Sequence, residues 1–83
     1  MKSTHSKEYG QALAALIAAR KERQILQAQL AERLGKPQSF VSKYEAKERR
    51  LDIVEFVAVC RAMGANPVAL LREAGLITED DLK

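Results

Sequence analysis

The hydrophobic and polar residues of this chain alternate with the period of an α-helix. Apolar side chains that recur three and four positions apart mark a helix with one buried face. This spacing predicts five helices, over residues 8–24, 27–34, 38–46, 53–63 and 67–74, and therefore an all-α fold. The expected inner row of the first helix is Tyr9, Leu13, Leu16 and Ile17, and that of the fourth is Ile53, Phe56, Val57, Cys60 and Met63.

Residues suited to helix ends stand at the predicted boundaries. Ser6 is expected to cap the first helix, and Asp52 the fourth, where Glu55 completes a capping box. Asn66 suits the cap of the fifth helix and Pro67 its first position. Glycine adopts a left-handed backbone without strain, and it follows the second, fourth and fifth helices at Gly35, Gly64 and Gly75.

Residues 27–46 predict two short helices that meet at Gly35. Their inward rows are Leu30, Ala31 and Leu34 in the first helix, and Val41, Tyr44 and Glu45 in the second. The small side chain of Ala31 lets the second helix cross the first closely. Two helices joined in this way by a short turn containing glycine form a helix-turn-helix.

The outward face of the second helix is polar and cationic. It is expected to carry Ser39, Ser42, Lys43, Ala46 and Lys47, with Gln38 at its leading end and Phe40 on its flank. No carboxylate lies between Pro37 and Tyr44. Such a face suits the major groove of DNA. It is equally typical of a solvated helix in a small bundle, so the spacing alone leaves both interpretations open.

The order Gln27, Ala31, Gly35, Gln38, Val41, Glu45 resembles the helix-turn-helix of the phage repressor and Cro (XRE-like) family. The resemblance extends to Leu16, Ile17 and Arg20 before it, and to residues 50–71 after it, so that it covers residues 9–74. It implies a five-helix, lambda-repressor-like domain that acts as a sequence-specific transcriptional regulator, with repressor as the expected role.

The resemblance also implies roles for the residues of the second helix. Gln38, with its two-sided amide, is expected to contact adenine, and Lys43 guanine or a phosphate. Ser39 leaves room for close approach, and Ser42 is expected to bond the backbone. Phe40 either contacts a thymine methyl or sugar, or packs on Tyr44.

Phosphate contacts are expected around this helix. Gln27 matches a family position that bonds a phosphate. The cations that flank the second helix, expected to position the protein without reading sequence, are Lys36, Lys47, Arg49 and Arg50.

The chain departs from the family at three helix ends. Leu26 and Pro37 stand where Ser or Thr usually caps a helix. The helix start at Leu26 is therefore either weaker or satisfied by water, and the exact position of the start at Pro37 is open. Lys47 stands where many relatives have glycine. The second helix therefore either continues past Lys47, or Lys47 adopts a strained turn.

Arg20 continues the inner row of the first helix, and a cation that points toward a core needs a partner. Glu45 is the expected partner, since the second motif helix turns it inward. In the resembled family these two positions form such an ion pair. We therefore predict a structural, bidentate Arg20–Glu45 salt bridge.

Composition and charge agree with one small domain that binds a polyanion. The 83 residues bury only a small core, so pairing of two copies would help. Residues 20–50 hold nine Lys or Arg against four Glu, a net charge of +5. Residues 51–83 hold three Lys or Arg against six Asp or Glu, a net charge of −3. The positive field therefore centres on the helix-turn-helix.

Several classes of protein lack support in the sequence. No HExxH, CxxC or glycine-rich phosphate loop is present, so we expect no enzyme activity, cofactor or metal. We also expect no membrane span and no signal peptide. The single cysteine, Cys60, excludes an internal disulfide and is expected to pack as an apolar residue, which fits a cytoplasmic, nucleoid-associated protein.

The expected organisation is a flexible arm (1–7), a helix-turn-helix domain (8–75) and a short C-terminal extension (76–83). The expected partners are double-stranded DNA and a second copy of the chain. The second copy is expected to contact apolar residues beside the fifth helix, such as Leu76 and Ile77. The alternative is that these residues pack back onto the monomer. Two other functions stay open: an antitoxin that holds a basic toxin through its acidic C-terminal third, and a protein-interaction module that has lost DNA binding.

Overall fold

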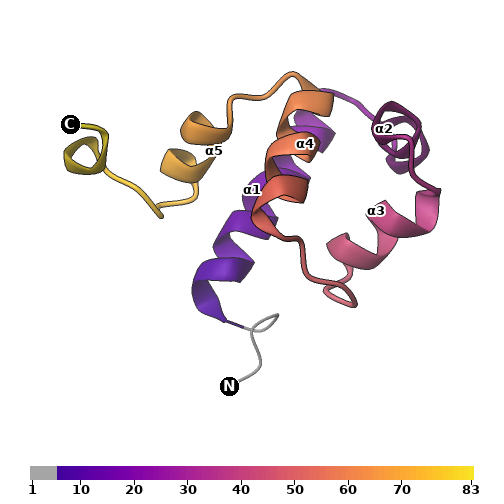
Figure 1. Cartoon of the computed structure of the whole chain (residues 1–83), viewed down its shortest axis with the longest axis horizontal. Helices are drawn as coiled ribbons and strands as arrows, with labels where there is room; N and C mark the ends of the chain where they lie inside the picture. Colours follow the sequence, from indigo (N-terminus) through magenta and orange to yellow (C-terminus); the bar gives the residue numbers. More distant parts are fainter. Residues whose placement is uncertain (1–5) are drawn as a thin grey trace.

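The computed structural model describes residues 6–83, and these form a helical domain (Figure 1). Its elements are α1 (Lys7–Glu22), α2 (Gln27–Leu34), α3 (Gln38–Glu45), α4 (Ile53–Met63), α5 (Pro67–Glu73) and the 3₁₀ helix η2 (Glu79–Leu82). The predicted all-α, five-helix fold is confirmed. Most of the predicted N-terminal arm lies outside the described residues, but Lys7 already belongs to α1.

Helices α1 and α4 cross at the centre of the molecule, with α2 and α3 on one side and α5 and η2 on the other (Figure 1). Leu30, Val41, Val59 and Cys60 are fully buried in the core between these helices. Burial raises the pKa of the Cys60 thiol to about 11. Cys60 is therefore a packed apolar residue, as its place in the helical pattern predicted.

Most helix ends use the caps expected from the sequence. Ser6 Oγ accepts from Tyr9 N at 3.1 Å, and Asn66 Oδ1 accepts from Val68 N at 2.9 Å. Leu26 has no capping side chain, and α2 instead begins with Gln29 Oε1 accepting from Leu26 N at 2.8 Å. Pro37 occupies the N-cap position of α3, one residue before the helix.

Three local features differ from the predicted pattern. Helix α1 ends at Glu22, two residues early, because the chain turns at Gln24, whose φ is +56°. Ile53 is 79% exposed, although it lies on the same face of α4 as Cys60. A hollow lies beside the first turn of α4, so no neighbouring side chain packs over Ile53. Val59, absent from the predicted row, is fully buried.

The C-terminal part turns away from the body of the domain (Figure 1). Helix α5 lies at 101° to α4. Leu76 and Ile77 are half-buried, and Asp81 accepts from Thr78 N at 2.8 Å at the start of η2. Within residues 6–83 no single helix is long and apolar enough to cross a membrane; only α4 and α5 taken together, with this bend between them, reach that length and composition.

A nearly buried ion pair joins α1 to α3. Arg20 Nε donates to Glu45 Oε2 at 2.7 Å and Arg20 Nη2 to Glu45 Oε1 at 3.0 Å, and the two side chains are 11% and 8% exposed. Arg20 Nη1 donates to Ile25 O at 2.8 Å, and Gln27 Nε2 donates to Glu45 Oε1 at 2.8 Å. The structure thus contains the predicted bidentate pair, and Gln27 extends it to α2.

We expect Arg20→Ala to lower the free energy of unfolding by roughly 3–5 kcal/mol, since it leaves Glu45 buried without a cation. Urea denaturation measures this change. The matched control is Lys21→Ala, because Lys21 is exposed and its removal should change stability by less than about 0.5 kcal/mol. Equal urea midpoints for Arg20→Ala and the parent protein would contradict a stabilising role.

The backbone at Lys47 ends the second motif helix. Lys47 has φ +63°, in the left-handed region, and Glu48 N donates to Lys43 O at 2.9 Å across the turn. Of the two alternatives for this position, the strained turn is the one observed. A residue with a Cβ costs roughly 1–2 kcal/mol in this conformation relative to glycine.

Lys47→Gly should therefore raise the free energy of unfolding by about 1 kcal/mol. The greater conformational freedom of glycine in the unfolded chain reduces this gain. Ala46→Gly is the matched control: Ala46 has φ −85°, so glycine relieves no strain there and should destabilise. Both are read from urea midpoints. A Lys47→Gly protein no more stable than the parent would show that the turn is not strained.

Candidate nucleic-acid interface

Helix α3 presents one face to the core and the opposite face to solvent. Val41 and Tyr44 are buried against the other helices, with exposed fractions of 0% and 1%. Gln38, Ser39 and Lys43 project from the other side and are exposed. The inward residues therefore fix the rotation of α3, and this rotation leaves the predicted reading residues uncovered by the protein.

Phe40 and Ser42 are half-buried on the flanks of this face. The Phe40 ring packs edge-on against Tyr44, with centroids 5.7 Å apart and planes at 70°. This is the second of the two predicted roles of Phe40; a thymine contact stays a prediction. Ser42 Oγ donates to Ser39 O at 3.3 Å, which is the expected bond to the backbone.

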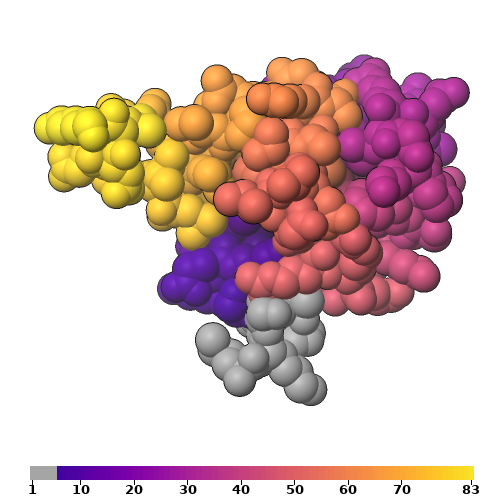
Figure 2. All heavy atoms as spheres, in the orientation of Figure 1, coloured from indigo at the N-terminus to yellow at the C-terminus, as the bar shows by residue number. Residues whose placement is uncertain are grey.

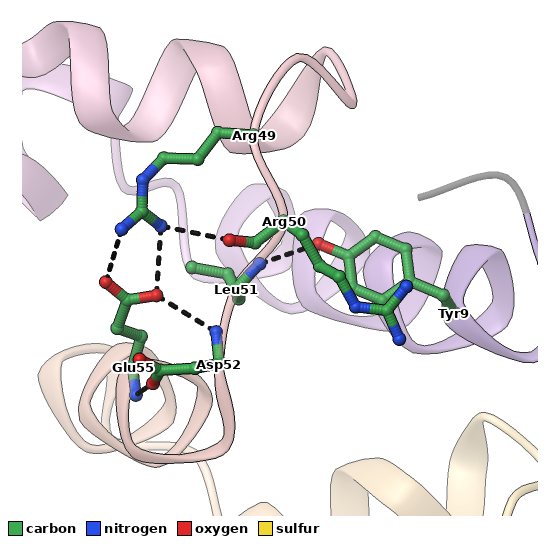
Figure 3. A network of polar contacts seen from close by, with 6 residues as sticks. All are labelled: Tyr9, Arg49, Arg50, Leu51, Asp52 and Glu55. Atoms are coloured by element: carbon green, nitrogen blue, oxygen red, sulfur yellow. Dashed lines mark hydrogen bonds and ion pairs between the residues drawn. The ribbon is translucent and has the colours of Figure 1, made fainter. Parts of the chain in front are cut away.

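Arg49 is held by a carboxylate at the start of α4 (Figure 3). Its Nη1 and Nη2 donate to Glu55 Oε1 and Oε2 at 2.9 and 2.6 Å, and Nη1 also donates to Arg50 O at 3.1 Å. The same guanidinium lies 4.7 Å from the centroid of the Phe40 ring. Arg49 therefore links α3 to α4, in addition to any contact with a ligand.

The Glu55 carboxylate also caps α4. Glu55 Oε1 accepts from Asp52 N at 2.9 Å, while Asp52 Oδ1 accepts from Glu55 N at 2.7 Å. This is the predicted capping box. The hydrogen bonds from Arg49 and from Asp52 N lower the pKa of Glu55 from 4.5 to about 2.

Tyr9 fixes the loop that follows α3. Leu51 N donates to Tyr9 Oη at 3.0 Å, and the guanidinium of Arg50 lies 4.5 Å from the centroid of the Tyr9 ring (Figure 3). Lys47 Nζ lies close to Gly10 on α1, 3.6 Å from the position that a Cβ would take there. Lys47 and Arg50 thus lie beside the start of α1.

Two of these contacts were not predicted from the sequence. Tyr9 was assigned only to the inner row of α1, and no local pattern pairs it with Leu51, which lies 42 residues away. Glu55 was assigned only to the capping box, and its six-residue separation from Arg49 across a loop has no fixed geometry. Arg33, which donates to Ala62 O at 3.1 Å, is a further link between α2 and α4.

The predicted contact residues thus fall into two groups. One group is exposed and comprises Lys36, Gln38, Ser39, Lys43, Lys47 and Arg50. The other is half-buried and comprises Gln27, Phe40, Ser42 and Arg49, each of which already has a partner in the protein. Glu45 on α3 and Glu55 at the start of α4 are each paired with an arginine. The exposed face of α3 is accordingly positive and presents hydrogen-bonding groups.

Two short helices joined at a left-handed glycine, with a polar cationic face on the second, define a helix-turn-helix protein of the DNA-binding class. The helix-turn-helix family model matches residues 16–70, more than half of the chain. The chain belongs to the XRE-like helix-turn-helix family of transcription regulators.

Solved structures agree with this assignment. An XRE-family like protein from Pseudomonas syringae pv. tomato is 49% identical, with a TM-score of 0.82 over 89% of this chain and 90% of that one. The clp gene regulator ClgR from C. glutamicum is 24% identical, with a TM-score of 0.75 over 86% and 92% of the two chains, and shares the fold. The search of curated proteins gave no match.

The low pKa of Glu55 predicts a pH dependence of stability. Because the folded-state pKa lies below the unfolded value, Glu55 contributes stability that is present above about pH 4.5 and lost as the pH falls toward about 2. Glu55→Gln keeps one oxygen that can accept from Asp52 N and Arg49 Nη1, but it loses the charge and the acceptor for Arg49 Nη2. Because the amide does not titrate, the urea midpoint of this variant should fall less over this range. Glu48→Gln, at an exposed glutamate, is the control and should keep the parent profile. Identical profiles for Glu55→Gln and the parent would contradict the assignment.

Proposed function

We propose that the protein is a sequence-specific transcriptional repressor that reads the major groove with α3. The observation that carries this proposal is the exposed face of α3, which is free of carboxylates between Pro37 and Tyr44. Burial of Val41 and Tyr44 holds this face outward, and membership of the XRE-like family gives it a DNA ligand. Binding, with no catalytic step, is sufficient for this function.

The proposed base contacts come from the first two turns of α3. The Gln38 amide both donates and accepts, which matches the N7 and N6 edge of adenine. Lys43 contacts guanine or a phosphate, and Ser39 between them leaves room for the base edges. Phe40, held edge-on by Tyr44, contacts a thymine methyl or a sugar from the flank.

The proposed phosphate contacts surround this helix. Lys36, Lys47 and Arg50 are exposed and meet the backbone on either side of α3. Gln27 uses one amide hydrogen on Glu45 and has a second for a phosphate. Arg49 keeps N–H groups beyond those paired with Glu55, because a guanidinium has five.

The working unit that we propose is a homodimer on a near-palindromic operator. Two recognition helices then lie in successive major grooves, about 34 Å apart. Such a protein acts in the cytoplasm, at the nucleoid, and represses a gene by occupying its operator.

Selection from random-sequence DNA with mobility-shift readout tests base reading. We expect Gln38→Ala and Lys43→Ala to change the selected sequence, since each removes a contact worth about 1–3 kcal/mol of base discrimination. Gln11→Ala and Lys21→Ala, exposed positions on α1, are matched for side chain and charge and should select the parent sequence. A parent sequence selected by all four variants would contradict reading by α3.

The salt dependence of affinity tests the phosphate contacts. If about five phosphates are neutralised per subunit, log affinity should fall against log salt with a slope near −9 for the dimer, at roughly −0.9 per contact. Lys36→Ala should make this slope less steep by about one contact per subunit while the selected sequence stays the same. An affinity that does not change with salt would exclude this mode of binding.

A further inference from the structure

Helix α4 leaves an apolar stripe uncovered beside its buried row. Ile53 is 79% exposed and Val54 is 74% exposed, more than any other large hydrophobic residue in the described part of the chain. Val57, which is half-buried, and the exposed Ala58 and Arg61 continue the stripe at helical spacing. In Figure 2 the side chains of α4 lie at the centre of the face turned to the viewer, and no other helix covers them.

The stripe is shaped like one half of a helix–helix contact. Its residues line a shallow groove of about 330 Å³. Ala58 has the smallest side chain among them, so a second helix can approach closely at that level. Val54 stands one turn before Ala58 and forms a ridge of the size that such a groove accepts.

The charges at the two ends of the stripe are opposite. Asp52 precedes α4, and Arg61 lies near its end. Within residues 6–83, neither side chain takes part in an ion pair. Two copies of α4 that pack antiparallel bring the Arg61 of each copy next to the Asp52 of the other, so the stripe is complementary to itself in charge.

We propose that this α4 stripe is the surface through which two copies of the chain associate, with their α4 helices antiparallel and Val54 of each seated beside Ala58 of the other. The inference rests on the proposed homodimer and gives it a definite interface. It places that interface on α4 and not beside α5, where the sequence had suggested it. Parallel packing is disfavoured because it sets Arg61 against Arg61 and Asp52 against Asp52.

This arrangement also leaves both recognition helices free. A two-fold axis that relates antiparallel helices lies in the contact plane and runs across them. In Figure 1 that direction leads from α4 toward the side where α2 and α3 lie, so both α3 helices come to the same side of the dimer. Each molecule is 21 Å thick along the viewing direction of Figure 1. Two copies stacked in this direction are therefore thick enough to hold their recognition helices about 34 Å apart.

Sedimentation velocity of single variants of the full chain tests the interface. We expect Val54→Asp to sediment as a 9.2 kDa monomer at concentrations where the parent is twice as heavy. Two controls replace exposed apolar residues elsewhere: Leu26→Asp before α2 and Val68→Asp on α5 should remain dimers. Unchanged circular dichroism shows that Val54→Asp is folded. A dimeric Val54→Asp, a monomeric parent, or a dimer lost through Val68→Asp would overturn the proposal.

A covalent cross-link tests the register. With Val54 of each copy beside Ala58 of the other, Val57 is the stripe residue nearest the two-fold axis, so Val57→Cys should form a disulfide-linked dimer under mild oxidation. The native Cys60 is fully buried and should not react. Ala14→Cys, at an exposed position on α1, is the control and should stay monomeric on a denaturing gel. Failure of Val57→Cys to cross-link faster than Ala14→Cys would overturn the antiparallel register.

Binding to a single half-site separates this inference from the proposed function. Monomeric Val54→Asp should lose affinity for the full operator by at least tenfold and keep the base preference of the parent on a half-site duplex. If the α4 dimer forms but Gln38→Ala leaves base preference unchanged, the proposed reading by α3 fails and the interface stands. If base preference depends on Gln38 but Val54→Asp is still a dimer, the interface fails and the reading stands.

Discussion

The placement of α3 depends on one ion pair between Arg20 and Glu45. The carboxylate is on α3 and the guanidinium is on α1, and both are nearly removed from water. Such a pair adds little net stability compared with an apolar contact of the same shape, but leaving either partner alone is costly. Its hydrogen bonds have defined directions, so the pair acts together with the buried Val41 and Tyr44 to hold α3 in one rotation against α1. That rotation turns Gln38, Ser39 and Lys43 outward.

The sequence predicted those features that depend on residues close together in the chain. Helix periodicity placed Leu30, Val41 and Tyr44 in the core, and local chemistry placed the caps at Ser6 and Asp52. The Arg20–Glu45 pair was predictable over 25 residues because both side chains lie on inward rows. The Tyr9–Leu51 bond and the Arg49–Glu55 pair depend on the path of a loop, which periodicity does not define. By its position in the helical repeat Ile53 belongs to the inner row of α4, but no neighbour covers it. The helical repeat alone does not show where the core ends.

The basic residues of the helix-turn-helix region have two distinct roles. Arg20 and Arg49 are bound to carboxylates and hold α3 to α1 and α4. Lys36, Lys43 and Lys47 are exposed, without ion-pair partners among the described residues, and create the positive potential in front of α3. The formal charge of the segment therefore overstates the number of cations that are free to meet a polyanion. The paired arginines hold α3 in its orientation, and the exposed lysines supply the unpaired positive charge beside it.

The buried thiol of Cys60 has a practical consequence. It is the single cysteine of the chain, it is fully enclosed by the core, and its raised pKa keeps it protonated at neutral pH. A thiol reagent therefore reacts with the native chain only when the helices around α4 separate. The rate of labelling at this position is a probe of core opening that requires no engineered site, and a DNA ligand that holds the helices together slows it.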